Sequence, residues 1–188
     1  MKTYLRAVCI SSVVFAALFT TSPQSFAGKE KTEDELIQDF THPKDSVVKS
    51  AMVAVEKRFP RSAKAMPHLK AALKSERVEV RRKAARVLGV WHEKLSAEEL
   101  QPIFAMLKVN ERGETCDALK ALGDMREKSA VPEILPCLKS DNAFIVRDAC
   151  RALALIGDKS AIPAIEPLLT SSDAKIKKDA EDAIFKLK

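Results

Sequence analysis

A short stretch near the C-terminus, Gly157-Asp158-Lys159-Ser160, has the residue types of a phosphate-binding loop. Such a loop needs a glycine, four further residues and then Gly-Lys-Ser or Gly-Lys-Thr after a strand. Here no glycine directly precedes Lys159, and the residues before Gly157 have the apolar period of a helix. We therefore interpret the stretch as a turn. Gly157 ends one helix in the left-handed conformation, Ser160 caps the next helix, and Pro163 lies in its first turn.

Three aspartates, Asp117, Asp148 and Asp179, are the best-aligned polar residues of the sequence. Carboxylates at one site bind cations or transfer protons, but the oxygen ligands of a cation must lie within about 2.5 Å of it, whereas neighbouring helices lie about 8–10 Å apart. We therefore expect local ion pairs, Asp117 with Lys120 and Asp148 with Arg151, three residues apart on one helix.

No constellation for catalysis is predicted. The histidines, His42, His68 and His92, do not fall at metal-ligand spacing with one another or with a cysteine. The sequence has no Cys-x-x-Cys motif and no nucleophile motif around a serine. We predict no catalytic residue, no metal and no cofactor, and hence a protein that is not an enzyme.

The elements that must position these residues repeat along the chain. ALKALGDMREKSAVPEILPCLKSD and ACRALALIGDKSAIPAIEPLLTSS align at a shift of 31 residues. This periodicity is typical of a solenoid, in which each unit buries its apolar face against its neighbours. Two columns recur at spacings of 31 to 34 residues, one of alanines that permit close helix approach and one of larger aliphatic residues: Ala51, Ala84, Ala118, Ala149 and Ala180, then Val55, Leu88, Leu122, Leu153 and Ile184.

Each unit shows the apolar period of two consecutive helices. Capping boxes at Thr32 to Glu35 and Ser96 to Glu99 mark two helix starts. Pro136 and Pro167 predict a kink or a late start in the second helix of their units. The predicted fold is all-α, an α-α superhelix of about four helix-turn-helix repeats with a terminal capping helix. The expected helices are a leading one at 33–41, pairs at 45–58 and 63–74, 77–91 and 97–108, 112–125 and 130–139, 142–156 and 161–170, and a last one at 173–187.

The segments VRRKAARVLG (80–89), TCDALKALGD (115–124) and VRDACRALALIGDKSAIPAIEPLL (146–169), and more weakly VVKSAMVAV (47–55), resemble the HEAT-repeat superfamily. The resemblance is to the short bacterial units also found in the phycobilin lyase HEAT-like family. It implies a repeat fold that mostly binds other proteins, with the second helices lining the concave side. Two departures are Phe59-Pro60-Arg61 in place of a glycine turn, and Cys116 in the column of Arg82 and Arg147.

The second helices carry more apolar residues than one buried stripe needs, which indicates either packing between repeats or a docking groove. The candidate protein-binding residues on these helices are His68, Lys70, Gln101, Phe104, Met106, Glu133, Leu135 and Glu166.

The cysteines allow two interpretations. Cys137 and Cys150 lie on helices that pack together, so a disulfide would close a loop of about 13 residues. The alternative, which the apolar column of Cys150 favours, is that both are buried free thiols. Cys116, in a column of arginines, is the thiol that we expect to be exposed.

The densest basic cluster, Arg77, Arg81, Arg82, Lys83 and Arg86, spreads around one helix and has no interleaved aromatic residues. A solvated face is the favoured interpretation, and an anion-binding patch is the alternative.

Residues 1–27 have the three parts of a secretory signal peptide: Lys2 and Arg6, an uncharged apolar run, and small residues up to Ala27. The mature domain is then 28–188, with no transmembrane anchor, and its net charge falls from +6 to +4 because two basic residues are removed. We expect an exported protein, periplasmic or secreted if bacterial.

The sequence therefore predicts an exported, non-enzymatic adaptor that binds another protein or a peptide. One alternative is a small-ligand or lyase-like role, by analogy with the phycobilin lyases. The other is anion or nucleic-acid binding through residues 77–86, although the mild net charge gives no reason to expect a nucleic acid.

Overall fold

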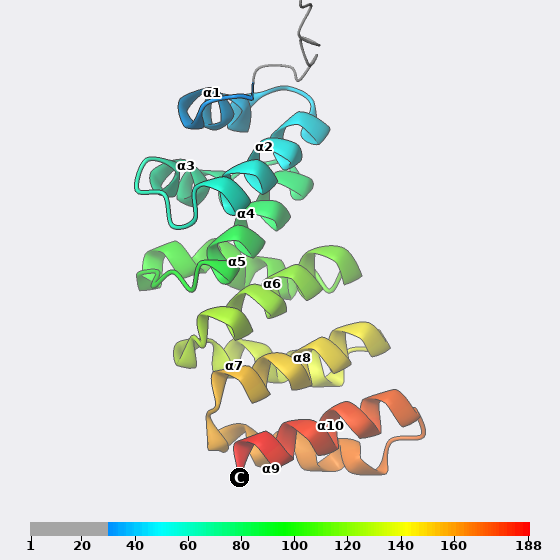
Figure 1. The fold of residues 1–188 in the computed structure, drawn as a ribbon. Helices are drawn as coiled ribbons and strands as arrows, with labels where there is room; N and C mark the ends of the chain where they lie inside the picture. The colour runs from blue at the N-terminus through cyan, green and yellow to red at the C-terminus, as the bar shows by residue number, and fades with distance from the viewer. Residues whose placement is uncertain (1–29) are drawn as a thin grey trace, which may run out of the picture. The chain divides into compact units, whose positions relative to one another are not determined.

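The computed structural model describes residues 30–188, and the predicted signal peptide, residues 1–27, lies outside this range. Residues 31–188 form one compact unit in which every described regular element is an α- or 3₁₀-helix (Figure 1). None of the described helices is long and apolar enough to cross a membrane. The predicted all-α solenoid is confirmed.

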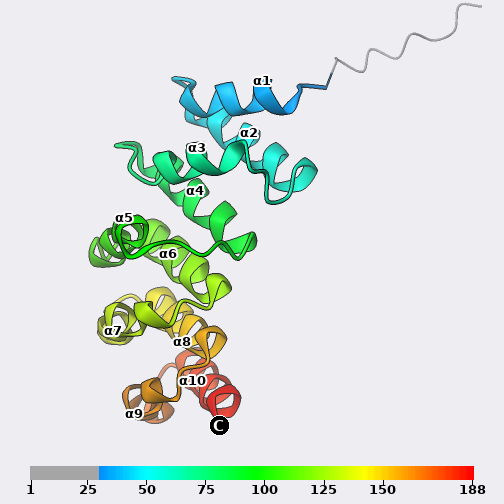
Figure 2. The same cartoon turned by 90° about the vertical axis from the view of Figure 1, so that its left-hand side faces the viewer.

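The helices form two layers, which Figure 2 shows side by side. The first-helix layer consists of α2 (Asp45–Arg58), α4 (Val78–Val90), α6 (Arg112–Met125), α8 (Ala143–Ile156) and α10 (Ala174–Leu187). The second-helix layer consists of α3 (Ala65–Ala72), α5 (Ala97–Lys108), α7 (Val131–Ile134) with η3 (Leu135–Lys139), and α9 (Ile162–Ile165) with η5 (Glu166–Thr170). The remaining elements are α1 (Glu33–Gln38), η1 (Asp39–Thr41), η2 (Lys128–Ala130) and η4 (Lys159–Ala161).

Small residues line the seams between successive first helices. The predicted alanine column is buried throughout, with 3% exposure at Ala51 and none at the other four positions. Two glycines bring the helices closer still. A Cβ on Gly89 of α4 would lie 2.7 Å from the Cα of Ala121, and one on Gly123 of α6 would lie 3.0 Å from the Cα of Ala152. Because the helix backbones approach so closely at these two glycines, they leave no room for a larger side chain.

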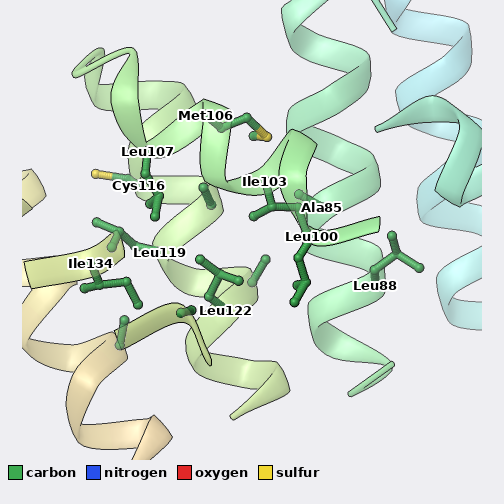
Figure 3. Close-up of a cluster of buried hydrophobic side chains, with 14 of the residues drawn as sticks. Ala85, Leu88, Leu100, Ile103, Met106, Leu107, Cys116, Leu119, Leu122 and Ile134 are labelled. Atoms are coloured by element: carbon green, nitrogen blue, oxygen red, sulfur yellow. The ribbon is translucent and has the colours of Figure 1, made fainter. Parts of the chain in front are cut away.

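The core lies between the two layers. Figure 3 shows Leu100 and Ile103 of α5 beside Leu88 of α4 and Leu119 and Leu122 of α6. These five side chains are at most 3% exposed, so α5 buries an apolar stripe against α4 and α6.

Proline divides two of the second helices, as predicted. The α-helical part of the third pair ends at Ile134, and a 3₁₀-helix begins before Pro136. The fourth pair has the same break before Pro167. A proline has no N–H to donate to the carbonyl four residues earlier, so the α-helix cannot continue unchanged through it.

The helix caps agree with the sequence except at one position, whereas α3 is shorter than the predicted 63–74 and the predicted helix 33–41 is divided into α1 and η1. Both capping boxes are present, with Thr32 and Ser96 as N-caps. Gly157 ends α8 with a φ of +77°, as predicted. Ser160 is not the cap of the next helix, because its backbone N–H donates to the carboxylate of Asp158 at 2.9 Å and Asp158 is the N-cap of η4.

Candidate functional site

An apolar groove crosses the second-helix layer of the last two units. It has a volume of about 620 Å³ and is lined by Pro132, Leu135, Pro136, Leu138, Lys139, Pro163, Ala164, Pro167 and Leu168, which we call the proline groove. All four prolines are exposed, and Leu135 and Leu168 are partly exposed. The groove therefore presents an apolar surface that the rest of the described chain does not cover.

The repeat itself builds this groove. Pro132 and Pro136 recur one unit later as Pro163 and Pro167, at a shift of 31 residues. The first proline of each pair lies in the first turn of α7 or α9, where a missing backbone donor is tolerated, and the second lies in the first turn of η3 or η5. Both units therefore place two rigid rings on the same side of the layer.

A smaller hollow of about 350 Å³ adjoins the groove and shares Pro136 and Lys139 with it. An ion pair between Lys108 and Glu133, 3.3 Å from Nζ to Oε2, lies at this hollow. The Lys108 side chain is 71% exposed, so the pair adds little stability and leaves both charges accessible.

The eight predicted binding residues do not lie together at one site. Leu135 lines the proline groove and Glu133 lines the adjoining hollow. Phe104 and Met106 were wrong as binding residues, because they are 8% and 1% exposed and Met106 lies in the core cluster of Figure 3.

The other four predicted residues line neither hollow. His68, Gln101 and Glu166 are exposed, and Lys70 pairs with Glu99 at 3.2 Å. The four groove prolines are the residues that the sequence analysis missed. Their recurrence at the repeat spacing was a usable signal, because a ring that ends a helix also remains on its surface.

The residues of the predicted basic cluster form ion pairs between helices. Each of its five residues faces an acidic side chain, in the pairs Arg77–Asp45 at 3.0 Å, Arg81–Glu114 at 2.7 Å, Arg82–Asp117 at 2.8 Å, Lys83–Glu56 at 2.7 Å and Arg86–Asp117 at 3.9 Å. Arg77, Arg81 and Lys83 are therefore held by separate acids of neighbouring helices, whereas Arg82 and Arg86 both face Asp117.

The aspartate column belongs to the same system. Asp179 accepts from Arg147 at 2.6 Å, which repeats the Arg82–Asp117 pair two units later. Asp148 pairs with Arg151 at 3.3 Å, as predicted. The predicted partner of Asp117 was wrong, because Lys120 lies 3.6 Å from Asp148 instead. Paired with bases of this kind, the aspartates tie successive units together.

The described cysteines are buried free thiols. Cys137 and Cys150 form no disulfide, which agrees with the favoured alternative. The expectation of an exposed Cys116 was wrong, since only 6% of the residue is exposed. Burial, with a contribution from Asp148, raises the pKa of Cys116 to about 12, and burial raises the pKa of Cys150 to about 12 as well. These thiols remain protonated and unreactive near neutral pH.

In residues 30–188, no three histidine, cysteine or carboxylate side chains are grouped to hold a metal.

Comparison with known proteins supports the repeat assignment. Residues 112–184 match the family model of HEAT repeats. No curated protein matches the chain.

Two solved structures illustrate the likeness of fold. A chain in the complex of CpcE and CpcF of phycocyanin lyase from Nostoc sp. PCC7120 is 22% identical, with a TM-score of 0.72 over 86% of this chain. The match spans 66% of that chain, just under two thirds of its length. A designed armadillo repeat protein in complex with the peptide (KR)4 is 19% identical, with a TM-score of 0.66 over 82% of this chain and 81% of that one. At these identities the likeness concerns the fold, and the chain is an all-α solenoid of HEAT-like repeats.

Proposed function

We propose that the protein is a non-enzymatic adaptor that binds a segment of another protein in the proline groove. The observation that carries this proposal is an uncovered apolar groove of about 620 Å³ on the second-helix layer. A contiguous apolar surface that is exposed to water is typical of a docking site, because burying it against a partner is favourable. In the first-helix layer, in contrast, Arg81, Arg82 and Arg147 already have acidic partners within the chain.

The groove suits an extended or helical segment with apolar side chains. Its length follows two units, and the adjoining hollow with Lys108 and Glu133 adds polar groups at one end. Apolar walls with a few polar groups are the usual composition of a recognition site. Two structures of similar fold support a binding role: the designed armadillo repeat protein is in complex with a peptide, and CpcE is in complex with CpcF.

We also propose that the adaptor acts outside the cytoplasm, after removal of residues 1–27. The charged start, the short apolar run and the small residues before position 28 support this proposal. N-terminal sequencing of the protein from a cell fraction tests it, and a chain that still begins at Met1 would argue against export.

Selection of peptides tests the adaptor proposal and does not require the natural partner to be identified first. A random peptide library is selected on the purified protein, and the recovered peptides are titrated against the double variant Leu135→Asp/Leu168→Asp. We expect wild-type binding and at least about tenfold weaker binding to the variant, since charges in an apolar site oppose burial. The matched control, Val78→Asp/Phe185→Asp, adds the same charges at residues that are 41% and 83% exposed and line neither hollow. Equal losses in both variants, or no recovered peptide, would contradict the proposal.

A small ligand is the second candidate occupant, because the groove volume falls within the range of about 300–1,000 Å³ of small-molecule sites. Native mass spectrometry of the protein purified from its own source tests this. A stoichiometric added mass that disappears in Leu135→Asp/Leu168→Asp would favour the ligand over the peptide.

A further inference from the structure

The charged contacts of the first-helix layer have a gap at Cys116. Two positions before the column alanine of each unit, α4 carries Arg82 and α8 carries Arg147, and each donates to an aspartate of the following unit. The same position of α6 is Cys116. Asp148, the corresponding aspartate of the following unit, therefore accepts no hydrogen bond from an arginine at position 116 of α6.

A hollow of about 610 Å³ lies at this gap, and we call it the Cys116 pocket. Three acidic residues line it, against six basic ones: Arg82, Arg86, Arg112, Lys120, Arg147 and Arg151. Glu79 and Asp179 pair with Arg82 and Arg147 from outside the lining, so an excess of one positive charge remains at the pocket. A cysteine side chain is much shorter than that of arginine, so the space that an arginine would fill stays open.

Three of the basic groups keep donors available. Arg86 and Lys120 are 53% and 51% exposed, and their acid contacts, 3.9 Å to Asp117 and 3.6 Å to Asp148, are longer than direct hydrogen bonds. Arg112 has no ion pair in the described part of the chain. Its guanidinium carbon lies 3.6 Å from the ring centroid of Phe144, a stacking that fixes the guanidinium plane and leaves its N–H edges free.

Arg82 and Arg147 serve as the walls of the pocket. They are held by Asp117 and Asp179 at 2.8 and 2.6 Å. The Arg82 guanidinium lies against Gly113, where an added Cβ would approach its Cζ to 2.9 Å. Glycine at this position therefore lets a fixed positive charge lie beside the start of α6.

We propose that the Cys116 pocket binds a phosphate group, with Arg86, Arg112 and Lys120 as its donors. Donors from two helices surround the space, and a phosphate offers three or more acceptor oxygens and up to two charges to them. A single guanidinium is enough to bind a carboxylate, so three donors favour a phosphate over a carboxylate. A cation would be repelled by the excess positive charge. The Cys116 thiol stays neutral, because burial raises its pKa to about 12, so it does not repel the anion. This site lies on the first-helix layer and is independent of the proline groove.

Calorimetric titration of the purified protein with inorganic phosphate tests the proposal, with sodium chloride at equal ionic strength as the reference. We expect saturable binding to the wild-type protein. Arg112→Ala and Lys120→Ala should each weaken it by about tenfold, the effect of one charge-assisted hydrogen bond. Cys116→Arg should abolish it by filling the pocket, whereas Cys116→Ala should keep it.

The control is Lys178→Ala, which removes an exposed charge from α10 outside the pocket and should leave binding unchanged. Arg112 and Lys120 are exposed, so their variants report on binding even if Cys116→Arg fails to fold. Vesicles of phosphatidylglycerol, compared with phosphatidylcholine, distinguish a lipid headgroup from a free phosphate, and binding by either source must be weakened by Arg112→Ala. Absence of binding to both sources, or binding that Arg112→Ala leaves unchanged, would overturn the proposal.

Discussion

The two helix layers use the same repeat in different ways. In the first-helix layer, arginines and aspartates in register join one unit to the next, as in Arg82–Asp117 and Arg147–Asp179. In the second-helix layer, prolines in register interrupt the helices and leave the apolar proline groove uncovered. Regular placement of a charged residue along the repeats therefore does not identify a binding site. The contacts of a residue determine its role, because a paired charge stabilises the stack and an uncovered apolar residue remains available to a partner.

The largest expected difference between the layers is in stability. Leu122→Ala removes a side chain with no exposure and should lower the free energy of unfolding by about 2–5 kcal/mol. Leu168→Ala, at a partly exposed position of the proline groove, should lower it by less than about 1 kcal/mol, because most of its apolar surface is not buried. Urea unfolding followed by circular dichroism measures both. Similar losses would contradict the division between core and groove.

The ion pairs of the first-helix layer should have a smaller effect. Removing the carboxylate in Asp117→Ala leaves the partly buried Arg82 without its 2.8 Å partner and should reduce stability by about 1–2 kcal/mol. A double-mutant cycle with Arg82→Ala isolates the pair, because the coupling energy excludes the separate effects of each side chain. Asp148→Ala serves as the comparison, since Cys116 supplies no guanidinium to Asp148 and the loss should be smaller. A coupling energy of zero would show that these charges do not hold the units together.

Helix caps give the smallest effect, and it depends on pH. Backbone N–H donors hold the pKa of Glu99, Asp158 and Asp173 below the ordinary values of 4.5 for glutamate and 3.8 for aspartate. Because the pKa is lowered on folding, this stabilisation is fully present above those ordinary values and is lost as the pH falls through the folded pKa.

Melting temperatures of wild type and Asp158→Asn between pH 7 and pH 3 test the cap at η4. Asparagine also caps a helix but does not titrate, so the variant should lose less stability on acidification than the wild type. Parallel curves would mean that Asp158 does not contribute to the acid sensitivity.

The sequence was sufficient for the fold and for much of its detail. Apolar periodicity, the alanine column and the two capping boxes predicted the helix pairs, because these features depend on local geometry that each unit repeats. The breaks at Pro136 and Pro167 were predicted for the same reason.

The contacts between units were harder to predict. Arg82 and Asp117 are 35 residues apart, and rules for residues three or four apart on one helix cannot find that pair. Phe104 was misplaced because helical periodicity shows that a residue is apolar but not how many neighbouring helices cover it. Cys116 was expected at the surface because its column elsewhere holds arginine, whose long side chain reaches solvent from a buried position.

Hydrogen–deuterium exchange with and without a selected peptide shows whether a partner binds to the second-helix layer. We expect the peptide to slow exchange in residues 131–139 and 162–170 and to leave 112–125 and 143–156 unchanged. Protection confined to the first helices would contradict this expectation.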